Sequence, residues 1–229
     1  MFSLPGNPNL WLSIGLVFLW LTLVLLLAEA LNRFAGWDAE MSRKVVHIGT
    51  GPVILLAWWL HIPAWIGIGA GTLAGILAAI SHRINILPSV NSVGRQTWGT
   101  FFYGISVGIL IAWFWPQNSP QYAAIGILVM ALGDGFAAVI GQKFGRHPYQ
   151  IWGMNKSWEG SLTMLIISYS VTSLILLPLQ GPIATTWIVA LITAGAATSL
   201  ESFSKYGIDN LTVPVGSAAI SFWLLQALP

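Results

Sequence analysis

The sequence predicts an all-α integral membrane protein, a polytopic bundle of about eight transmembrane helices (roughly seven to nine) without a soluble domain. Composition is the first reason: 56% of the 229 residues are hydrophobic and 7% are charged, whereas soluble domains carry about 25% charged residues. The second reason is that apolar runs near the length of about 20 residues needed for a spanning helix fill most of the chain. Cysteine is absent, which excludes disulfides and thiolate chemistry.

The apolar runs follow one another with short links between them. The first run has no basic residues before it and is long, so we expect a span rather than a signal peptide. The third run contains Gly67, Gly71 and Gly75 at four-residue spacing, which predicts close packing between helices. The expected spans are 10–31, 45–60, 63–80, 98–115, 122–140, 160–179, 183–200 and 214–228.

Charge is distributed unevenly between the links. With eight spans, the links 32–44, 81–97, 141–159 and 201–213 fall on one face and contain all nine Lys and Arg residues. The positive-inside rule makes that face cytoplasmic and places both termini on the opposite face. A net charge of +2 is too small and too local to indicate a nucleic-acid partner. This pattern indicates a membrane enzyme that acts on a cytosolic cosubstrate.

Asp134 is the central candidate, in the stretch ALGDGFAAVIGQKFGRHPYQIWGMNKSWEGS at 131–161. An ionised group costs about 2.5–3.5 kcal/mol at the centre of a bilayer. We therefore expect Asp134 to be a metal or proton ligand, rather than only one half of a packing pair. Gly133 and Gly135 are expected to leave room for a ligand. The G-x-G-x-x-A spacing does not indicate a dinucleotide site, because no strand precedes it.

The segment NKSWEGS, 155–161, lies where a link enters a helix. Helix N-termini bind phosphate, and Lys156 and Ser157 add a positive charge and a hydroxyl. Glu159 has a carboxylate that could hold Mg²⁺. The alternative is a capping sequence, with Asn155 or Ser157 as the N-cap and Glu159 in the first turn. The segment does not match a Walker A loop, because Asn155 stands where that loop requires glycine.

The motif RKVVH, 43–47, places Arg43, Lys44 and His47 on one helical face. Interfacial anchoring explains the Arg and the Lys, but a membrane-buried imidazole favours a functional role for His47. Gly49 and Gly51 follow and are expected to clear space there.

Two further links carry polar groups. Glu201 and Lys205 are four residues apart, so we expect a salt bridge at a helix end. Asp209 and Asn210 either form a turn or supply oxygen ligands to a metal or a ribose. In RQTWGT, 95–100, membrane anchoring competes with a functional role for Arg95.

These motifs resemble the phytol kinase and dolichol kinase family of polyprenol kinases, and most of all the phytol and farnesol kinases of cyanobacteria and plastids. The resemblance covers nearly the whole chain in the same order, and its specific part is the DG…KSWEG block. It implies a single membrane-embedded polyprenol kinase domain over residues 1–229. Such an enzyme transfers the γ-phosphate of CTP, or of another nucleoside triphosphate, to an isoprenoid alcohol. Phytol is the expected acceptor, giving phytyl phosphate for tocopherol formation or phytol salvage.

The resemblance places function on Arg43, Lys44, His47, Asp134, Lys156, Ser157, Glu159, Asp209 and Asn210 without assigning their roles. The roles follow from phosphoryl transfer, in which positioning and charge stabilisation matter most, with the alcohol entering from the membrane lipid. Asp134, with Glu159 or Asp209, is expected to hold Mg²⁺ against the nucleotide. His47 or Asp134 is expected to accept the hydroxyl proton. The remaining expected contacts to nucleotide and phosphate are Arg43, Lys44, Lys156, Ser157 and Asn210.

Three other functions compete with this one. A cytidylyltransferase resembling CDP-diacylglycerol synthase is the main alternative, although its closely spaced C-terminal Asp residues are not found here. An ion-coupled transporter would use Asp134 and His47 as a relay, but no internal repeat is found. A non-catalytic scaffold would leave the DG and NKSWEGS motifs unexplained.

Overall fold

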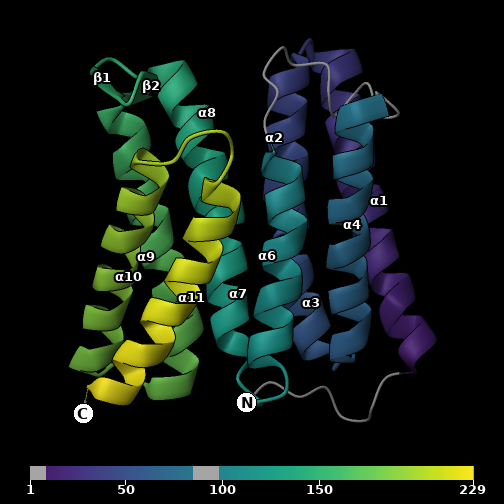
Figure 1. The fold of residues 1–229 in the computed structure, drawn as a ribbon, viewed down its shortest axis with the longest axis vertical. Coiled ribbons are helices and arrows are strands. Elements are labelled where there is room, and N and C mark those ends of the chain that lie inside the picture. Colours follow the sequence, from purple (N-terminus) through teal and green to yellow (C-terminus); the bar gives the residue numbers. More distant parts are fainter. Residues whose placement is uncertain (1–8, 85–97, 229) are drawn as a thin grey trace.

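A computed structural model describes residues 9–84 and 98–228. Long helices stand side by side, and one small hairpin lies at one end (Figure 1). The predicted helical membrane character is confirmed. Among the described residues, three helices are long and apolar enough to cross a membrane, namely Leu10–Ala35, Pro120–Phe144 and Trp158–Gln180.

Helices cover each apolar run of the sequence. The second run is split into two helices at Gly51–Pro52, and Arg95 of the RQTWGT motif lies outside the described residues. The order is α1 (Leu10–Ala35), α2 (Ala39–Thr50), α3 (Val53–Trp59), α4 (Ala64–Ile84), α6 (Gly99–Phe114), α7 (Pro120–Leu128), the π-helix η1 (Val129–Asp134), α8 (Gly135–Phe144), β1 (Pro148–Ile151), β2 (Met154–Ser157), α9 (Trp158–Gln180), α10 (Ala184–Ser202) and α11 (Asp209–Ala227).

The continuous rod α7–η1–α8 forms the centre of the bundle. Figure 1 shows α7 between α9, α10 and α11 on one side and α2 and α6 on the other. In its most apolar stretch 72% of the residues are buried. A Cβ added at Gly126 would lie 2.3 Å from the peptide oxygen of Pro214, so α7 and α11 pack backbone against backbone. This central rod carries Asp134 into the interior.

The predicted glycine face of α4 is confirmed. A Cβ added at Gly71 would lie 2.8 Å from the peptide oxygen of Gly104 in α6, and one added at Gly67 would lie 2.5 Å from Ile111. Small residues therefore let these two helices approach closely, as in other membrane bundles.

The expectation that Gly133 and Gly135 leave room for a ligand is wrong. A Cβ at Gly133 would lie 2.7 Å from the sulfur of Met164 in α9, and one at Gly135 would lie 2.3 Å from Cγ1 of Ile48 in α2. Both glycines are filled by neighbouring helices. They bring α2 and α9 close to the segment that carries Asp134.

The same correction applies to α2, where Gly49 and Gly51 were expected to clear space. A Cβ at Gly49 would lie 2.5 Å from Val24 of α1, and one at Gly51 would lie 2.5 Å from the Cβ of Ala131. The Trp20 indole also donates a hydrogen bond to the peptide oxygen of Gly49, 2.8 Å away. Helix α2 is thus packed between α1 and η1.

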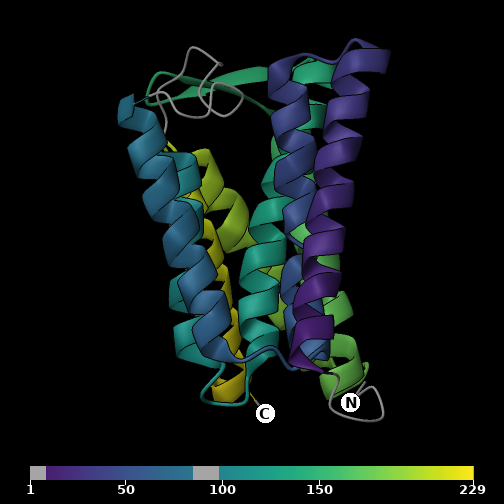
Figure 2. The ribbon, with the colours of Figure 1, turned by 90° about the vertical axis from the view of Figure 1, so that its right-hand side faces the viewer.

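The hairpin β1–β2 is the one departure from an all-α fold in the described residues. Its two-residue turn has positive φ at Trp152 (50°) and Gly153 (76°), as the type I′ turns of short hairpins require. The register pairs Tyr149 with Lys156, so both side chains lie on the same face of the hairpin. Figure 2 shows the strands lying across one end of the bundle.

The two ends of the bundle differ in charge. The hairpin and the α10–α11 link lie at one end, and the first turn of α1 and the last turn of α11 lie at the other (Figure 1). The turns at 60–63, 115–119 and 180–183 contain no Lys, Arg, Asp or Glu. The polar chemistry described below therefore belongs to the hairpin end.

Candidate active site

Asp134 is the last residue of the π-helix η1 and lies between α7 and α8. A π-helical turn takes in an extra residue, and such turns occur frequently at functional sites. The Asp134 side chain is only 14% exposed. A carboxylate so placed needs a charged partner or a ligand.

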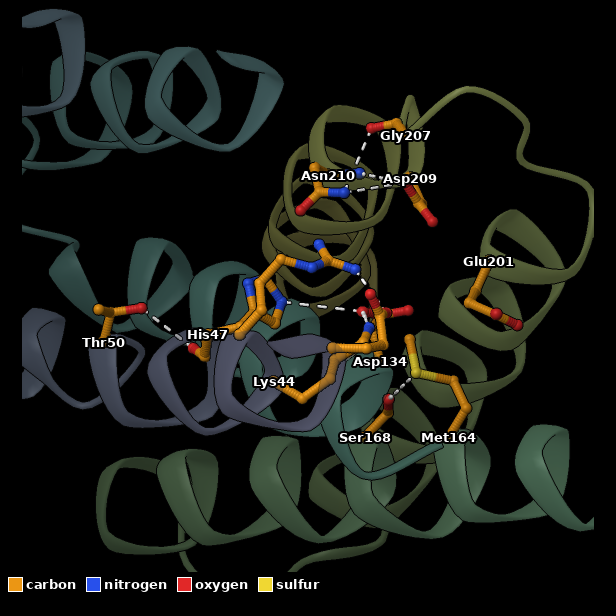
Figure 3. Close-up of polar contacts among 12 residues, drawn as sticks. Lys44, His47, Thr50, Asp134, Met164, Ser168, Glu201, Gly207, Asp209 and Asn210 are labelled. Atoms are coloured by element: carbon orange, nitrogen blue, oxygen red, sulfur yellow. Dashed lines mark hydrogen bonds and ion pairs between the residues drawn. The ribbon is translucent and has the colours of Figure 1, made fainter. Parts of the chain in front are cut away.

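Lys44 of α2 supplies that partner. Its ammonium donates a hydrogen bond to Oδ2 of Asp134 at 3.0 Å, and the Lys44 side chain is itself only 11% exposed. His47, one turn later, points its Nε2 toward the same oxygen at 3.8 Å (Figure 3). That distance is too long for a hydrogen bond, so the buried Nε2 has no hydrogen-bond partner. Lys44 and His47 of the RKVVH motif thus both point toward the Asp134 carboxylate.

Lys156 of β2 makes a second buried pair, with Glu201 of α10. The Lys156 ammonium donates to the Glu201 carboxylate and, at 3.3 Å, to the Glu201 peptide oxygen. The expected salt bridge from Glu201 to Lys205 is wrong, because Lys205 lies over the ring of Tyr206 instead. The sequence does contain a signal for Glu201, because it is an acidic residue at the very end of an apolar run.

The contact with Glu201 stabilises the protonated form of Lys156. Partial burial by itself would lower the pKa of Lys156, but the Glu201 carboxylate and its hydrogen bond raise that pKa above its ordinary value. Lys156 is therefore a fixed positive charge at neutral pH.

The hairpin brings Lys156 to this position. Tyr149 and Lys156 are opposite each other in the register and therefore share one face of the hairpin. Their contacts with α9 and α10 show that this face is turned toward the bundle. The Tyr149 hydroxyl lies 2.6 Å from Oγ of Ser161 in α9 and 3.3 Å from Oγ of Ser202 in α10. Asn155 faces the other way and accepts a hydrogen bond from Gln150 on β1. The contacts of Tyr149 thus hold the hairpin against α9 and α10.

Asp209 begins α11 and is oriented by the next residue. The backbone N–H and the side-chain amide of Asn210 each donate to Oδ1 of Asp209 at 3.0 Å, and that amide also donates to the peptide oxygen of Gly207 at 3.3 Å. Asp209 interacts electrostatically with both Asp134 and Lys156. The predicted pair Asp209–Asn210 therefore faces the same site.

We define the acid–lysine cluster as the five charged residues Lys44, Asp134, Lys156, Glu201 and Asp209. They come from α2, η1, β2, α10 and α11, and each interacts electrostatically with at least one other. Three carboxylates face two ammonium groups, which leaves the cluster short of positive charge.

The donor set of the cluster suits a hard cation. Carboxylate oxygens are the ligands that Mg²⁺ prefers, and Mg²⁺ is often held by only one or two carboxylates together with substrate phosphates. Within 9–84 and 98–228, no three His, Asp or Glu side chains lie close enough to form a metal site by themselves. Asp134 and Asp209 supply carboxylates of the type that Mg²⁺ binds.

Three predicted residues have other contacts. Glu159 accepts a hydrogen bond from the exposed ring of His147, with Oε1 and Nδ1 2.7 Å apart. Ser157 is the N-cap of α9, as the capping alternative predicted, and its hydroxyl accepts from the Gly160 N–H at 3.1 Å. Arg43 binds Glu40 in its own helix. The structure does not bring Glu159 together with Asp134 and Asp209.

Comparisons with known proteins find relatives that are named phytol kinases or probable phytol kinases. The chain is 52% identical over 218 residues to a phytol kinase of Synechocystis sp., covering 95% of this chain and 94% of the relative. It is 29% identical to probable phytol kinase 2 of Oryza sativa (82% of this chain, 67% of the relative) and 28% identical to phytol kinase 1 of Arabidopsis thaliana (85% and 69%), both chloroplastic. No protein-family model and no solved structure matches.

Proposed function

Because the chain belongs to the phytol kinase family, we propose that it transfers the γ-phosphate of CTP, or of another nucleoside triphosphate, to the hydroxyl of phytol. The expectation of a kinase is confirmed by that membership. The acid–lysine cluster is the observation that supports this reaction most directly. The product would be phytyl phosphate, for use in tocopherol formation or phytol salvage.

Phosphate binding is assigned to the two lysines. Phosphoryl transfer passes through a loose transition state, so positioning and charge neutralisation dominate its catalysis. Lys156 on β2, fixed by Glu201, and Lys44 on α2, at 3.0 Å from Asp134, contribute one ammonium group each to the cluster. Arg43 precedes Lys44 in the sequence, and we assign it a secondary role in phosphate binding, because Glu40 already balances its charge.

Magnesium is assigned to Asp134 and Asp209. The cluster has one more carboxylate than ammonium groups, so by itself it would repel a triphosphate. A bound Mg²⁺ would supply the missing positive charge next to the phosphates. Glu159 is left out of this assignment, because it is paired with His147 instead.

We assign His47 as the acceptor of the proton that the alcohol hydroxyl loses. The alcohol oxygen forms a bond to the γ-phosphorus, the bond from that phosphorus to the nucleoside diphosphate breaks, and the hydroxyl proton needs an acceptor. His47 Nε2 is buried and has no hydrogen-bond partner, whereas Oδ2 of Asp134 is engaged by Lys44. The imidazole is therefore the better acceptor of the two.

The assay that tests the function uses CTP labelled in two positions. Membranes containing the chain are incubated with γ-labelled or α-labelled CTP and with phytol, farnesol or geranylgeraniol. We expect label from the γ-position in the lipid fraction, with phytol as the best acceptor. Transfer of the α-label would indicate a cytidylyltransferase and would contradict the kinase proposal. Unlabelled ATP and UTP as competitors rank the donors.

We also propose a topology of eight spans, with the hairpin end cytoplasmic and both termini on the opposite side. The concentration of Lys and Arg in the links supports it. The chain has no cysteine, so single cysteines can be introduced at Arg146 and Gln180 without removing others. A membrane-impermeant maleimide should label the Gln180 variant, but not the Arg146 variant, from outside intact cells. The reverse pattern would overturn the orientation.

A further inference from the structure

The contact between Glu201 and Lys156 has a geometry beyond that of a simple ion pair. The Lys156 ammonium binds both the side chain and the peptide oxygen of Glu201. The Glu201 side chain is 8% exposed and stands at the end of α10, 45 residues from its partner along the chain. One residue thus holds the end of a long, flexible side chain at two points.

We propose that Glu201 is a positioning residue that fixes the Lys156 ammonium for the phosphates of the nucleotide. This inference rests on the proposed function. Lys156 also interacts electrostatically with Asp134 and Asp209, which are the carboxylates assigned to the cation. Without Glu201, the ammonium would be drawn toward those two carboxylates and would compete there with Mg²⁺. Glu201 therefore keeps the phosphate-binding charge apart from the cation site.

The exposed ion pair of α1 lacks these features. Glu29–Arg33 joins residues four apart within α1, with side chains 55% and 70% exposed. Exposed pairs of this kind contribute little to stability or to local order. Lys156–Glu201 instead joins the hairpin to α10 and is mostly buried. The pair therefore fixes a specific geometry, and Glu29–Arg33 is a matched control.

A double-mutant cycle tests the inference on the purified full chain in detergent. CTP affinity is measured by equilibrium binding in the presence of Mg²⁺, and kcat and KM are measured with phytol. We expect Glu201→Ala to weaken CTP binding at least tenfold, nearly as much as Lys156→Ala. Glu201→Gln, whose amide oxygen still accepts a hydrogen bond, should retain most of the affinity. Glu29→Ala should leave it unchanged.

The double variant decides whether Glu201 acts through Lys156. If it does, Lys156→Ala combined with Glu201→Ala binds CTP no more weakly than Lys156→Ala alone. Additive losses would overturn the inference. A lower melting temperature with unchanged CTP affinity would also overturn it, because that result describes a purely structural pair. A changed Mg²⁺ requirement for Glu201→Gln in the Lys156→Ala background would make Glu201 a metal ligand instead.

The design separates this inference from the proposed function. If the chain binds CTP but phosphorylates no alcohol, the proposed function fails and the CTP-binding cycle still decides the role of Glu201. If phytol is phosphorylated and the losses are additive, the kinase stands and the positioning role falls. Should Glu201→Ala not fold, Glu201→Gln and the double variant, which leaves no unpaired buried charge, carry the comparison.

Discussion

Helix α1 and the central rod α7–η1–α8 are both long and apolar enough to cross a membrane, yet they occupy opposite environments. In the most apolar stretch of α1 only 11% of the residues are buried, against 72% in the central rod. The exposed side chains of α1 include Leu25, Leu26 and Leu27, whereas α7 contains Ala123, Ala124 and Gly126 and is buried almost throughout.

The difference shows what distinguishes an outer helix from a central one in a membrane. Lipid chains are as apolar as leucine, so hydrophobicity does not pull helices together, and close approach depends on small residues. Nothing lies within 4 Å of a Cβ added at Gly15 of α1, whereas one added at Gly126 would meet the backbone of α11. The same close packing surrounds Asp134 with charged groups from other helices.

The largest expected effect is the difference between replacing Asp134 in the central rod and replacing Glu29 in α1. Asp134→Asn removes a buried charge from the acid–lysine cluster, and we expect phytol phosphorylation to fall on the order of a thousandfold. Glu29→Gln in α1 changes a carboxylate that is 55% exposed and should leave the rate unaltered. Both variants are assayed at equal protein level in membranes. Wild-type activity in Asp134→Asn would remove this residue from the reaction.

Much of the fold follows from apolar patterning, because a helix in lipid must satisfy its own backbone. The run 122–140 is covered by the rod Pro120–Phe144. The sequence contains no signal that we recognise for the π-helical turn Val129–Asp134 within this rod. The hairpin was missed because its turn is Trp152–Gly153, whereas Asn-Gly or Asp-Gly is the usual signal for such a turn.

The site was predictable where residues lie close in sequence or in family motifs. Lys44 and His47 share a helical face by spacing alone, and the structure directs both to Asp134. The partner of Glu201 was not predictable from local spacing, because Lys205 is nearer in sequence while Lys156 is nearer in space. The glycines near the site were interpreted as space for a ligand, and the sequence did not reveal that other helices fill that space.

A second comparison concerns side-chain packing. Ile125 in α7 is fully buried, and Leu26 in α1 is 60% exposed. We expect Ile125→Ala to lower the free energy of unfolding by about 2–5 kcal/mol, because it leaves a cavity between helices. Leu26→Ala should cost far less, because lipid or detergent fills the gap. Thermal unfolding of both variants in one detergent measures the difference, and equal losses would mean that α1 packs against a further surface.

A third comparison uses glycine. Gly126→Ala places a methyl group where the peptide oxygen of Pro214 now lies, and we expect about 1–3 kcal/mol of destabilisation from overpacking. Gly15→Ala has open space around it and should be neutral or slightly stabilising, because alanine is the better helix former. Melting temperatures report both effects. An unchanged melting temperature for Gly126→Ala would show that α7 and α11 separate without cost.

The smallest expected effect is that of Trp20→Phe, which tests whether α1 is only an outer helix. Trp20→Phe removes the hydrogen bond from the indole to the peptide oxygen of Gly49, two residues after His47. Polar contacts between membrane helices contribute about 0.6 kcal/mol on average, so we expect a slight fall in melting temperature and unchanged phytol phosphorylation. Trp11→Phe, at a side chain that is 77% exposed, is the control. A large loss of kinase activity in Trp20→Phe alone would show that α1 positions Lys44 and His47 through α2, and the contrast between outer and central helices would then not extend to function.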